Sequence, residues 1–276
     1  MIFLIVALLG FGYFSKDFRL DASSDTLLIE GDPDLKYLRE ITERYGSKDF
    51  LVLTYTPKDG MTSESSINNL LSLKYKIQSL DWVHNVITLL DIPLLNNSEA
   101  PLAERLKNFV TLKDEGVDKQ RGFNEILNSP VFRNFVISED GNTSGIIVNI
   151  KKDEKIKIIK DQDELEKHKD LIKKKNHENI LEIREIIKSY SKEAKIFLGG
   201  IPMIADDMMS FIKSDIIVFG VGVLLFIIAT LWFVFRKLIW IIVPISSCFF
   251  SVTIMTGLLG LLNWKVTVIS SNFIAL

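Results

Sequence analysis

Cysteine and histidine, the side chains that build disulfides and many metal sites, are scarce in this sequence. The one cysteine, Cys248, excludes a disulfide within the chain. The three histidines, His84, His168 and His177, have no cysteine, histidine or carboxylate partner at the spacing of a metal site. We therefore predict no metal site.

Motifs for nucleotide binding and covalent catalysis are also missing. The chain has no phosphate-binding P-loop, no G-x-G-x-x-G dinucleotide motif and no G-x-S-x-G nucleophile turn. The Lys-rich tract at 151–175 has charges of both signs, so we interpret it as a solvated helix surface and expect no nucleic-acid partner. The sequence predicts neither an enzyme nor a cofactor.

Charge is absent from two long stretches. Residues 216–235 and 238–262 contain no charged side chain. Twenty helical residues span about 30 Å, the thickness of the hydrocarbon core of a bilayer. Only Arg236 and Lys237 separate the two stretches. We predict two transmembrane helices, at 215–235 and 238–262, that form a tight hairpin.

Shorter apolar runs lie near both ends of the sequence. The first 14 residues are uncharged, and they lack the basic start and the cleavage site of a signal peptide. We predict a first transmembrane helix at 1–15 that is short or truncated. Residues 266–276 are too few to span a bilayer and predict the start of a truncated fourth helix. We expect the sequence to be the N-terminal portion of a longer multi-pass protein.

The charges of the short loop between the two long apolar stretches predict the orientation. Lys and Arg in short loops mark the cytoplasmic side of a membrane. The Arg236–Lys237 turn therefore predicts that residues 16–214 form a domain outside the cytoplasm. We expect a multi-pass protein of the cytoplasmic (inner) membrane.

The sequence patterns of residues 16–214 are those of an α+β domain. Residues 49–55 are rich in β-forming side chains, and 62–80 place apolar side chains on one helical face. Residues 82–90 are a second strand candidate. Strand, helix and strand in this order predict a βαβ unit.

A second unit of the same kind follows. Residues 131–138 and 143–150 flank the turn sequence at 139–142 and predict a β-hairpin. Residues 163–192 predict a long polar helix, and 194–200 predict a strand. We expect two small α/β subdomains.

Two segments carry a family resemblance. In residues 21–55, Gly31-Asp32-Pro33-Asp34 and Tyr45-Gly46 follow Ile29-Glu30. Residues 198–245 contain Gly-x-Pro, a basic turn and a proline in the next apolar run. With the order of the apolar runs, these segments resemble the resistance-nodulation-division (RND) superfamily, in particular exporters with the MMPL-type membrane domain. Ile29-Glu30 stands where Pro-Glu is usual, and the resemblance covers essentially the whole chain.

The resemblance implies an α+β membrane protein: transmembrane helices plus an extracytoplasmic porter-like domain of two ferredoxin-like α/β subdomains. It also implies export of hydrophobic or amphiphilic, lipid-like molecules, driven by proton or ion flow. The implied partners are the lipid bilayer and that substrate, with a homo-oligomer or accessory export proteins left open. The family's ion-carrying side chains lie in the fourth span and its later counterpart, so they are not assigned to residues of this sequence.

Gly199, Gly200 and Pro202 are a candidate hinge between the outer domain and the second span. The alternative is an ordinary strand-to-helix turn, and Pro202 suits the first turn of a helix. Asp206 and Asp207 follow near the positive end of that helix. We expect both carboxylates to lie in water, and we favour a helix-start role over a proton site.

Ser270, Ser271 and Asn272 are a candidate intramembrane polar path at the start of the fourth span. Small polar residues also serve helix packing, which is the alternative.

Two other functions compete with export. One is a membrane-anchored ligand sensor with an extracytoplasmic α/β domain, and the other is a protein-export accessory subunit of the same superfamily. A sensor predicts a signalling domain after few spans, whereas a transporter predicts more spans and a second outer domain.

Overall fold

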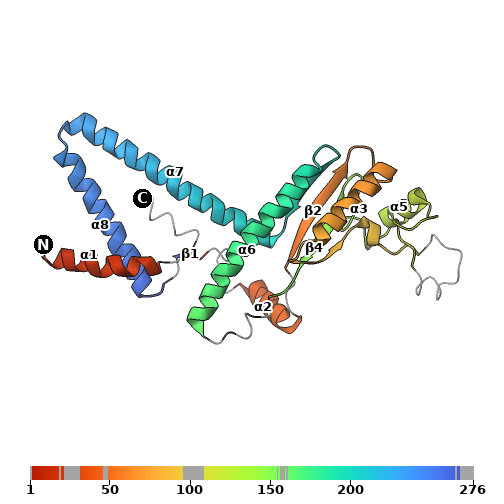
Figure 1. The fold of residues 1–276 in the computed structure, drawn as a ribbon, viewed down its shortest axis with the longest axis horizontal. Coiled ribbons are helices and arrows are strands. Elements are labelled where there is room, and N and C mark those ends of the chain that lie inside the picture. The colour runs from red at the N-terminus through yellow and green to blue at the C-terminus, as the bar shows by residue number, and fades with distance from the viewer. Residues whose placement is uncertain are drawn as a thin grey trace. The chain divides into compact units, whose positions relative to one another are not determined.

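The described part of the chain, in a computed structural model, comprises residues 2–18, 20–21, 32–45, 49–95, 109–153, 155, 159, 161–264 and 266–267. The chain divides into two compact units (Figure 1). Tyr45–Asp206 is called the α/β unit below, and Met1–Arg44 with Asp207–Leu276 is called the helical unit.

Four strands form the sheet of the α/β unit: β2 (Phe50–Pro57), β3 (Val83–Ile87), β4 (Ser144–Ile150) and β5 (Ala194–Gly199). Their order is β3-β4-β2-β5, and each neighbouring pair is antiparallel. Leu53, in the middle of β2, pairs with Ile146 of β4 and with Leu198 of β5. Strand β2 therefore has a hydrogen-bonded partner on each side, β4 and β5.

Two helices connect these strands. Helix α3 (Glu64–Gln78) lies between β2 and β3, and α6 (Gln162–Ser189) lies between β4 and β5. This β-α-β-β-α-β order with its antiparallel sheet is the ferredoxin-like arrangement. Figure 1 shows α3 and α6 against the sheet.

The apolar core lies between the sheet and these two helices. Alternate residues of β2, Leu51, Leu53 and Tyr55, are fully buried, because successive strand side chains point to opposite faces. On the other face, Phe50 and Phe197 are exposed. Isoleucines and leucines of both helices complete the core: Leu70, Leu73, Ile77, Ile180, Ile183 and Ile186.

The expectation of two α/β subdomains is wrong for the described residues. The strands of both predicted units belong to one sheet, since β4 lies between β2 and β3, and β5 pairs with β2 on its other side. Strands β2 and β3 are parallel to each other but not adjacent, and β4 fills the place between them. The described residues of the α/β unit therefore form one ferredoxin-like subdomain.

The predicted hairpin forms only in part. Residues 144–150 form β4, but 131–138 are a series of turns that touch the sheet through one antiparallel bridge, Ile137 to Ser144. Asn134 has a left-handed backbone, with φ at 63°, and Val136 donates to the Phe132 carbonyl at 2.8 Å. This compact turn prevents a regular strand, and β4 pairs with β2 and β3 instead.

Shorter helices lie between β3 and β4 in the sequence of the α/β unit. They are η3 (Leu89–Asp91) and α5 (Lys119–Leu127). The Asp118 carboxylate caps α5 by accepting from the backbone N–H groups of Gln120 and Arg121.

The helical unit contains the apolar helices. Its elements are α1 (Ile2–Phe14), η1 (Ser15–Asp17), β1 (Leu20–Asp21), α2 (Pro33–Tyr45), most of α7 (Ile201–Phe235), α8 (Ile239–Leu261) and β6 (Val266–Thr267). In the described residues, α7 and α8 are the helices long and apolar enough to cross a membrane. No residue in the most apolar stretch of α7 is buried, and 6% of the most apolar stretch of α8 is buried. The core helix of a soluble domain would be mostly buried, so neither helix is one.

The ends of this unit differ in part from the expectation. Helix α1 coincides with the predicted short first span, and α7 begins 14 residues before the predicted span at 215. Val266 and Thr267 form β6, which pairs in parallel with β1, so a helix does not begin there. The rest of the predicted fourth helix lies outside the described residues.

Candidate functional site

The candidate site is the joint where β5 ends and α7 begins. Gly199 is the last residue of β5 and pairs with Val52 of β2. Gly200 follows with φ at 120°, a conformation that L side chains rarely adopt. A Cβ at Gly200 would lie 2.8 Å from the Phe50 carbonyl oxygen. Glycine is therefore required at 200, whereas a Cβ at 199 would make only an ordinary contact, 3.7 Å from the Val52 oxygen.

Helix α7 starts directly after the turn at Gly200. The Gly200 carbonyl accepts from the Ile204 backbone N–H at 3.0 Å, which begins the helical hydrogen-bond pattern. Pro202 lies in the first turn, where its missing N–H is not needed. The structure thus contains the strand-to-helix turn, and the hinge role of Gly199, Gly200 and Pro202 stays a prediction.

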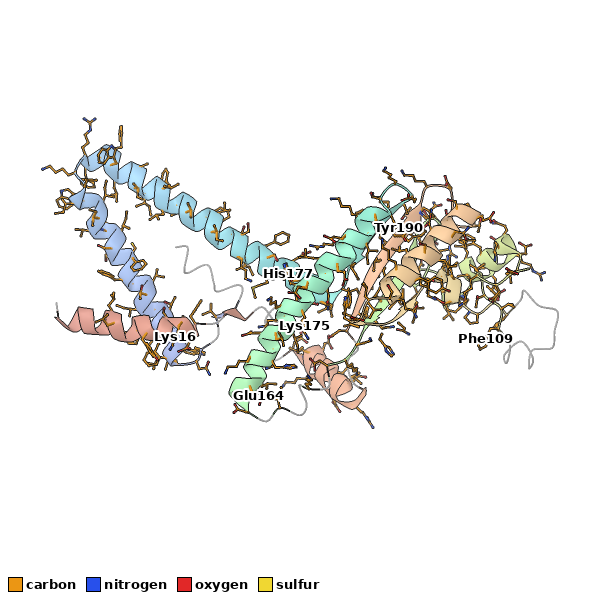
Figure 2. The ribbon with its side chains drawn as sticks, in the orientation of Figure 1. Lys16, Phe109, Glu164, Lys175, His177 and Tyr190 are labelled. Carbon is orange, nitrogen blue, oxygen red and sulfur yellow. The ribbon has the colours of Figure 1, made fainter. Side chains whose placement is uncertain are left out.

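Helix α6 holds the start of α7 through two neighbouring side chains. The Asn176 side-chain amide donates to the Pro202 carbonyl at 2.9 Å. His177 Nδ1 lies 2.9 Å and 3.1 Å from the two carboxylate oxygens of Asp206 (Figure 2 labels His177 on α6). These contacts fix the middle of α6 to the first two turns of α7.

The expectation that both acids after Pro202 lie in water is wrong for Asp206. The Asp206 side chain is only 9% exposed, while its partner His177 is 47% exposed. Asp207 is half-buried, so part of its side chain still meets water. Helix α6 covers Asp206, because His177 of α6 contacts it although the two residues are 29 positions apart in sequence. The sequence of α7 alone does not predict this contact.

Ser270, Ser271 and Asn272 lie outside the described residues, so their role as a polar path stays a prediction. In the described residues, no three His, Cys, Asp or Glu side chains gather as a metal site would need. His168 Nε2 lies 3.0 Å from an Asp153 carboxylate oxygen.

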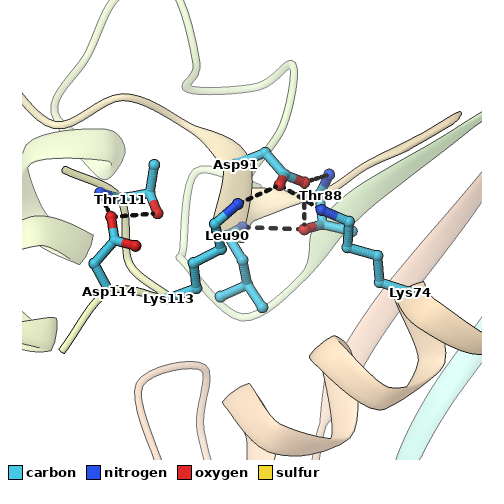
Figure 3. A network of polar contacts seen from close by, with 7 residues as sticks. All are labelled: Lys74, Thr88, Leu90, Asp91, Thr111, Lys113 and Asp114. Atoms are coloured by element: carbon cyan, nitrogen blue, oxygen red, sulfur yellow. Dashed lines mark hydrogen bonds and ion pairs between the residues drawn. The ribbon is translucent and has the colours of Figure 1, made fainter. Parts of the chain in front are cut away.

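A polar network that the sequence analysis missed lies in the α/β unit (Figure 3). The Lys74 ammonium, on α3, contacts the Asp91 carboxylate, which also accepts from the backbone N–H and the hydroxyl of Thr88. Burial acts to raise the pKa of Asp91, but the hydrogen bonds from Lys74 and Thr88 outweigh it and lower the pKa below 3.8. Lys113 lies 3.4 Å from the same carboxylate.

A sequence signal for this network exists. Thr88-Leu-Leu-Asp91 is a capping box, and the similar Thr111-Leu-Lys-Asp114 makes the same pair of contacts from Thr111 to the Asp114 carboxylate. Both threonine-x-x-aspartate motifs fix short turns. Their role is structural, because they hold the chain between β3 and α5.

A second missed feature is the close contact of α1 with α8 in the helical unit. A Cβ at Gly257 would lie 2.0 Å from the Phe11 carbonyl oxygen, and one at Gly260 would lie 2.1 Å from that of Phe14. Small residues spaced along an apolar helix are the sequence signal for such an approach. The two backbones meet where only glycine fits.

Comparison with known proteins gives one family. A family model described as the MMPL family matches residues 95–275, more than half of the chain. The matched range contains β4, α6, β5, the joint and both long apolar helices. No curated protein matches the chain.

Proposed function

Because the chain belongs to the MMPL family, and is therefore a membrane transport protein of the RND superfamily, we propose that it exports hydrophobic or amphiphilic molecules. The observation that carries the proposal is the matched range itself. It runs without a break from the α/β unit through the joint into α7 and α8. A soluble domain merely attached to an anchor would share only one of these parts with the family.

The proposed location is the cytoplasmic membrane, with the α/β unit outside the cytoplasm. Support comes from the apolar surfaces of α7 and α8 and from the charges in their connecting turn, Arg236 and Lys237. The bilayer and the exported molecule are the proposed partners. We propose no enzymatic role for this chain.

The proposed mechanism couples the α/β unit to α7 at the joint. Asn176 and His177 attach α6 to Pro202 and Asp206, and Gly200 forms the tight turn from β5 into the first turn of α7. A rearrangement that displaces α6 would therefore displace the start of α7. Proton or ion flow through the membrane helices would drive the cycle.

Dye accumulation tests the proposal. Cells with the gene that encodes this chain and cells lacking it are loaded with the lipophilic dye Nile red. We expect more dye in the cells that lack the gene, and we expect a protonophore to abolish the difference. A Gly200→Val variant, present in the membrane at the wild-type level, should behave like the deletion, whereas Gly199→Ala should behave like the wild type. Equal accumulation in all four strains would refute the export proposal.

A further inference from the structure

A histidine and a mostly buried aspartate meet where α6 contacts the first two turns of α7. His177 Nδ1 lies 2.9 Å and 3.1 Å from the two carboxylate oxygens of Asp206. The Asp206 side chain is 9% exposed, whereas the His177 side chain is 47% exposed. The carboxylate is therefore largely removed from water, while the imidazole ring can exchange protons with the solvent.

The core of the α/β unit holds both helices in place at this contact. Ile180, one turn after the histidine on α6, is fully buried, and Met203, one turn before the aspartate on α7, packs against the core. The Asn176 side-chain amide donates to the Pro202 carbonyl at 2.9 Å. A change in the charge of the histidine would therefore alter the strength of an attachment that already exists.

Protonation of His177 would change its contact with Asp206 from a hydrogen bond into an ion pair. Histidine is the side chain that changes its charge between about pH 5 and 8. The added positive charge would lie next to a carboxylate that water scarcely reaches, and opposite charges attract more strongly there than in water. We therefore expect the attachment of α6 to α7 to be stronger in mild acid.

Other charged side chains lie near the pair. Lys173 and Lys174 are one turn before the histidine on α6, and Asp207 is next to the aspartate on α7. Asp49 directly precedes β2, the strand against which the turn before α7 packs. Ammonium and carboxylate groups ordinarily keep their charge between pH 6 and pH 8. The charge that changes in this range is therefore that of the histidine.

We propose that the His177–Asp206 pair is a proton-binding site that sets how firmly α6 is attached to α7. With the proton bound, an ion pair holds the two helices together. Without it, the carboxylate keeps only a hydrogen bond, and the first turns of α7 separate from α6 more readily. The inference rests on the proposed function, because the pH outside the cytoplasm would then regulate the coupling of the α/β unit to a membrane helix.

A second histidine of α6 provides a matched control. His168 Nε2 lies 3.0 Å from an Asp153 carboxylate oxygen, and the Asp153 side chain is 36% exposed. This contact has the same chemistry, but its carboxylate meets more water and does not belong to α7. Removal of the His168 imidazole should therefore leave the start of α7 unchanged.

Hydrogen exchange read by mass spectrometry, with the full chain in phosphatidylcholine nanodiscs, tests the inference at pH 6 and pH 8. Exposure times are scaled for the intrinsic exchange rate at each pH. The peptide that covers 201–208 reports on the start of α7, and the amides of β2 and β4 report on the folded sheet. The variants are His177→Gln, whose amide can donate but does not titrate, Asp206→Asn and the control His168→Gln.

In the wild type we expect the protection of 201–208 to be about fivefold higher at pH 6 than at pH 8. The protection of the sheet amides should be the same at both pH values. The control His168→Gln should behave as the wild type does. His177→Gln and Asp206→Asn should each lose the difference between the two pH values.

Equal protection of 201–208 at both pH values in the wild type would overturn the inference. A difference that persists in both His177→Gln and Asp206→Asn would also overturn it, as would a difference that His168→Gln abolishes too. If one variant loses the protection of its sheet amides, the other variant and the wild type still decide. Because no transport is measured, this test can fail while the dye assay supports export, and it can succeed while the dye assay refutes export.

Discussion

The α/β unit and the helical unit use the same apolar side chains in opposite ways. Leu53 in the α/β unit is fully buried against other apolar residues, whereas Leu225 and Phe233 in α7 are 60% and 78% exposed. In the first case removal from water stabilises the fold. In α7 the exposed apolar side chains suit a lipid solvent. The contact between α1 and α8 relies instead on close backbone approach at glycines. One chain is therefore built for two solvents.

The largest effect should come from a core truncation. Leu53→Ala is expected to destabilise the α/β unit by about 2–5 kcal/mol, because it leaves a cavity in a close-packed core. Leu225→Ala, the same change on the exposed surface of α7, should leave the α/β unit unchanged. Hydrogen exchange of the β2 and β4 amides, read by mass spectrometry, measures the difference. Equal exchange of these amides in the two variants would contradict the difference between the buried and the exposed leucine.

The joint should be nearly as sensitive. Gly200→Ala is expected to cost about 2–3 kcal/mol, since its Cβ would require a strained backbone and would collide with the Phe50 carbonyl. The neighbouring Gly199→Ala is the control, because its Cβ has room. Urea denaturation midpoints of both variants test the pair. Similar midpoints would show that the turn at Gly200 adjusts freely.

In the helical unit, Gly257→Ala should weaken the α1–α8 contact by about 1–3 kcal/mol, because the new methyl group would overlap the Phe11 carbonyl. The readout is disulfide formation between cysteines at Gly12 and Thr253, which face each other, in a chain whose Cys248 is replaced by serine. Gly220→Ala, with open space around it, is the control. Undiminished crosslinking in the Gly257 variant would contradict the close contact.

The smallest effect concerns the polar network of the α/β unit. The pKa of Asp91 is lowered in the folded state, so the carboxylate stabilises the fold fully above its ordinary value of 3.8. This stabilisation is lost as the pH falls from 3.8 through the lowered pKa. Asp91→Asn should cost about 1 kcal/mol at pH 7. Melting curves of both proteins between pH 7 and pH 2 should converge in acid, and a constant gap would contradict the assignment.

Local patterns in the sequence predicted most elements but not their assembly. The strand at 49–55 and the polar helix at 163–192 correspond to β2 and α6, and the apolar stretches correspond to α7 and α8. The insertion of β4 between β2 and β3 depends on contacts between distant residues. Nothing in the local pattern of either βαβ unit specifies it.

The joint was predictable only in part for the same reason. Gly200 and Pro202 predict a turn and a helix start, and the structure has both features at these residues. The pairing of His177 with Asp206 joins two helices 29 positions apart, and no local signal reports it. The threonine-x-x-aspartate motifs and the glycines of α8 were readable signals, since each follows a known spacing rule.

Labelling of two cysteine variants in intact spheroplasts tests the central claim, that the long apolar helices cross the membrane and hold the α/β unit outside the cytoplasm. One variant has a cysteine in place of Lys175 on α6, which is exposed (Figure 2), and the other has one in place of Lys237 in the hairpin turn. Both lack Cys248. A membrane-impermeant maleimide should label position 175 before lysis and position 237 only after it. Labelling of position 175 only after lysis would contradict the account.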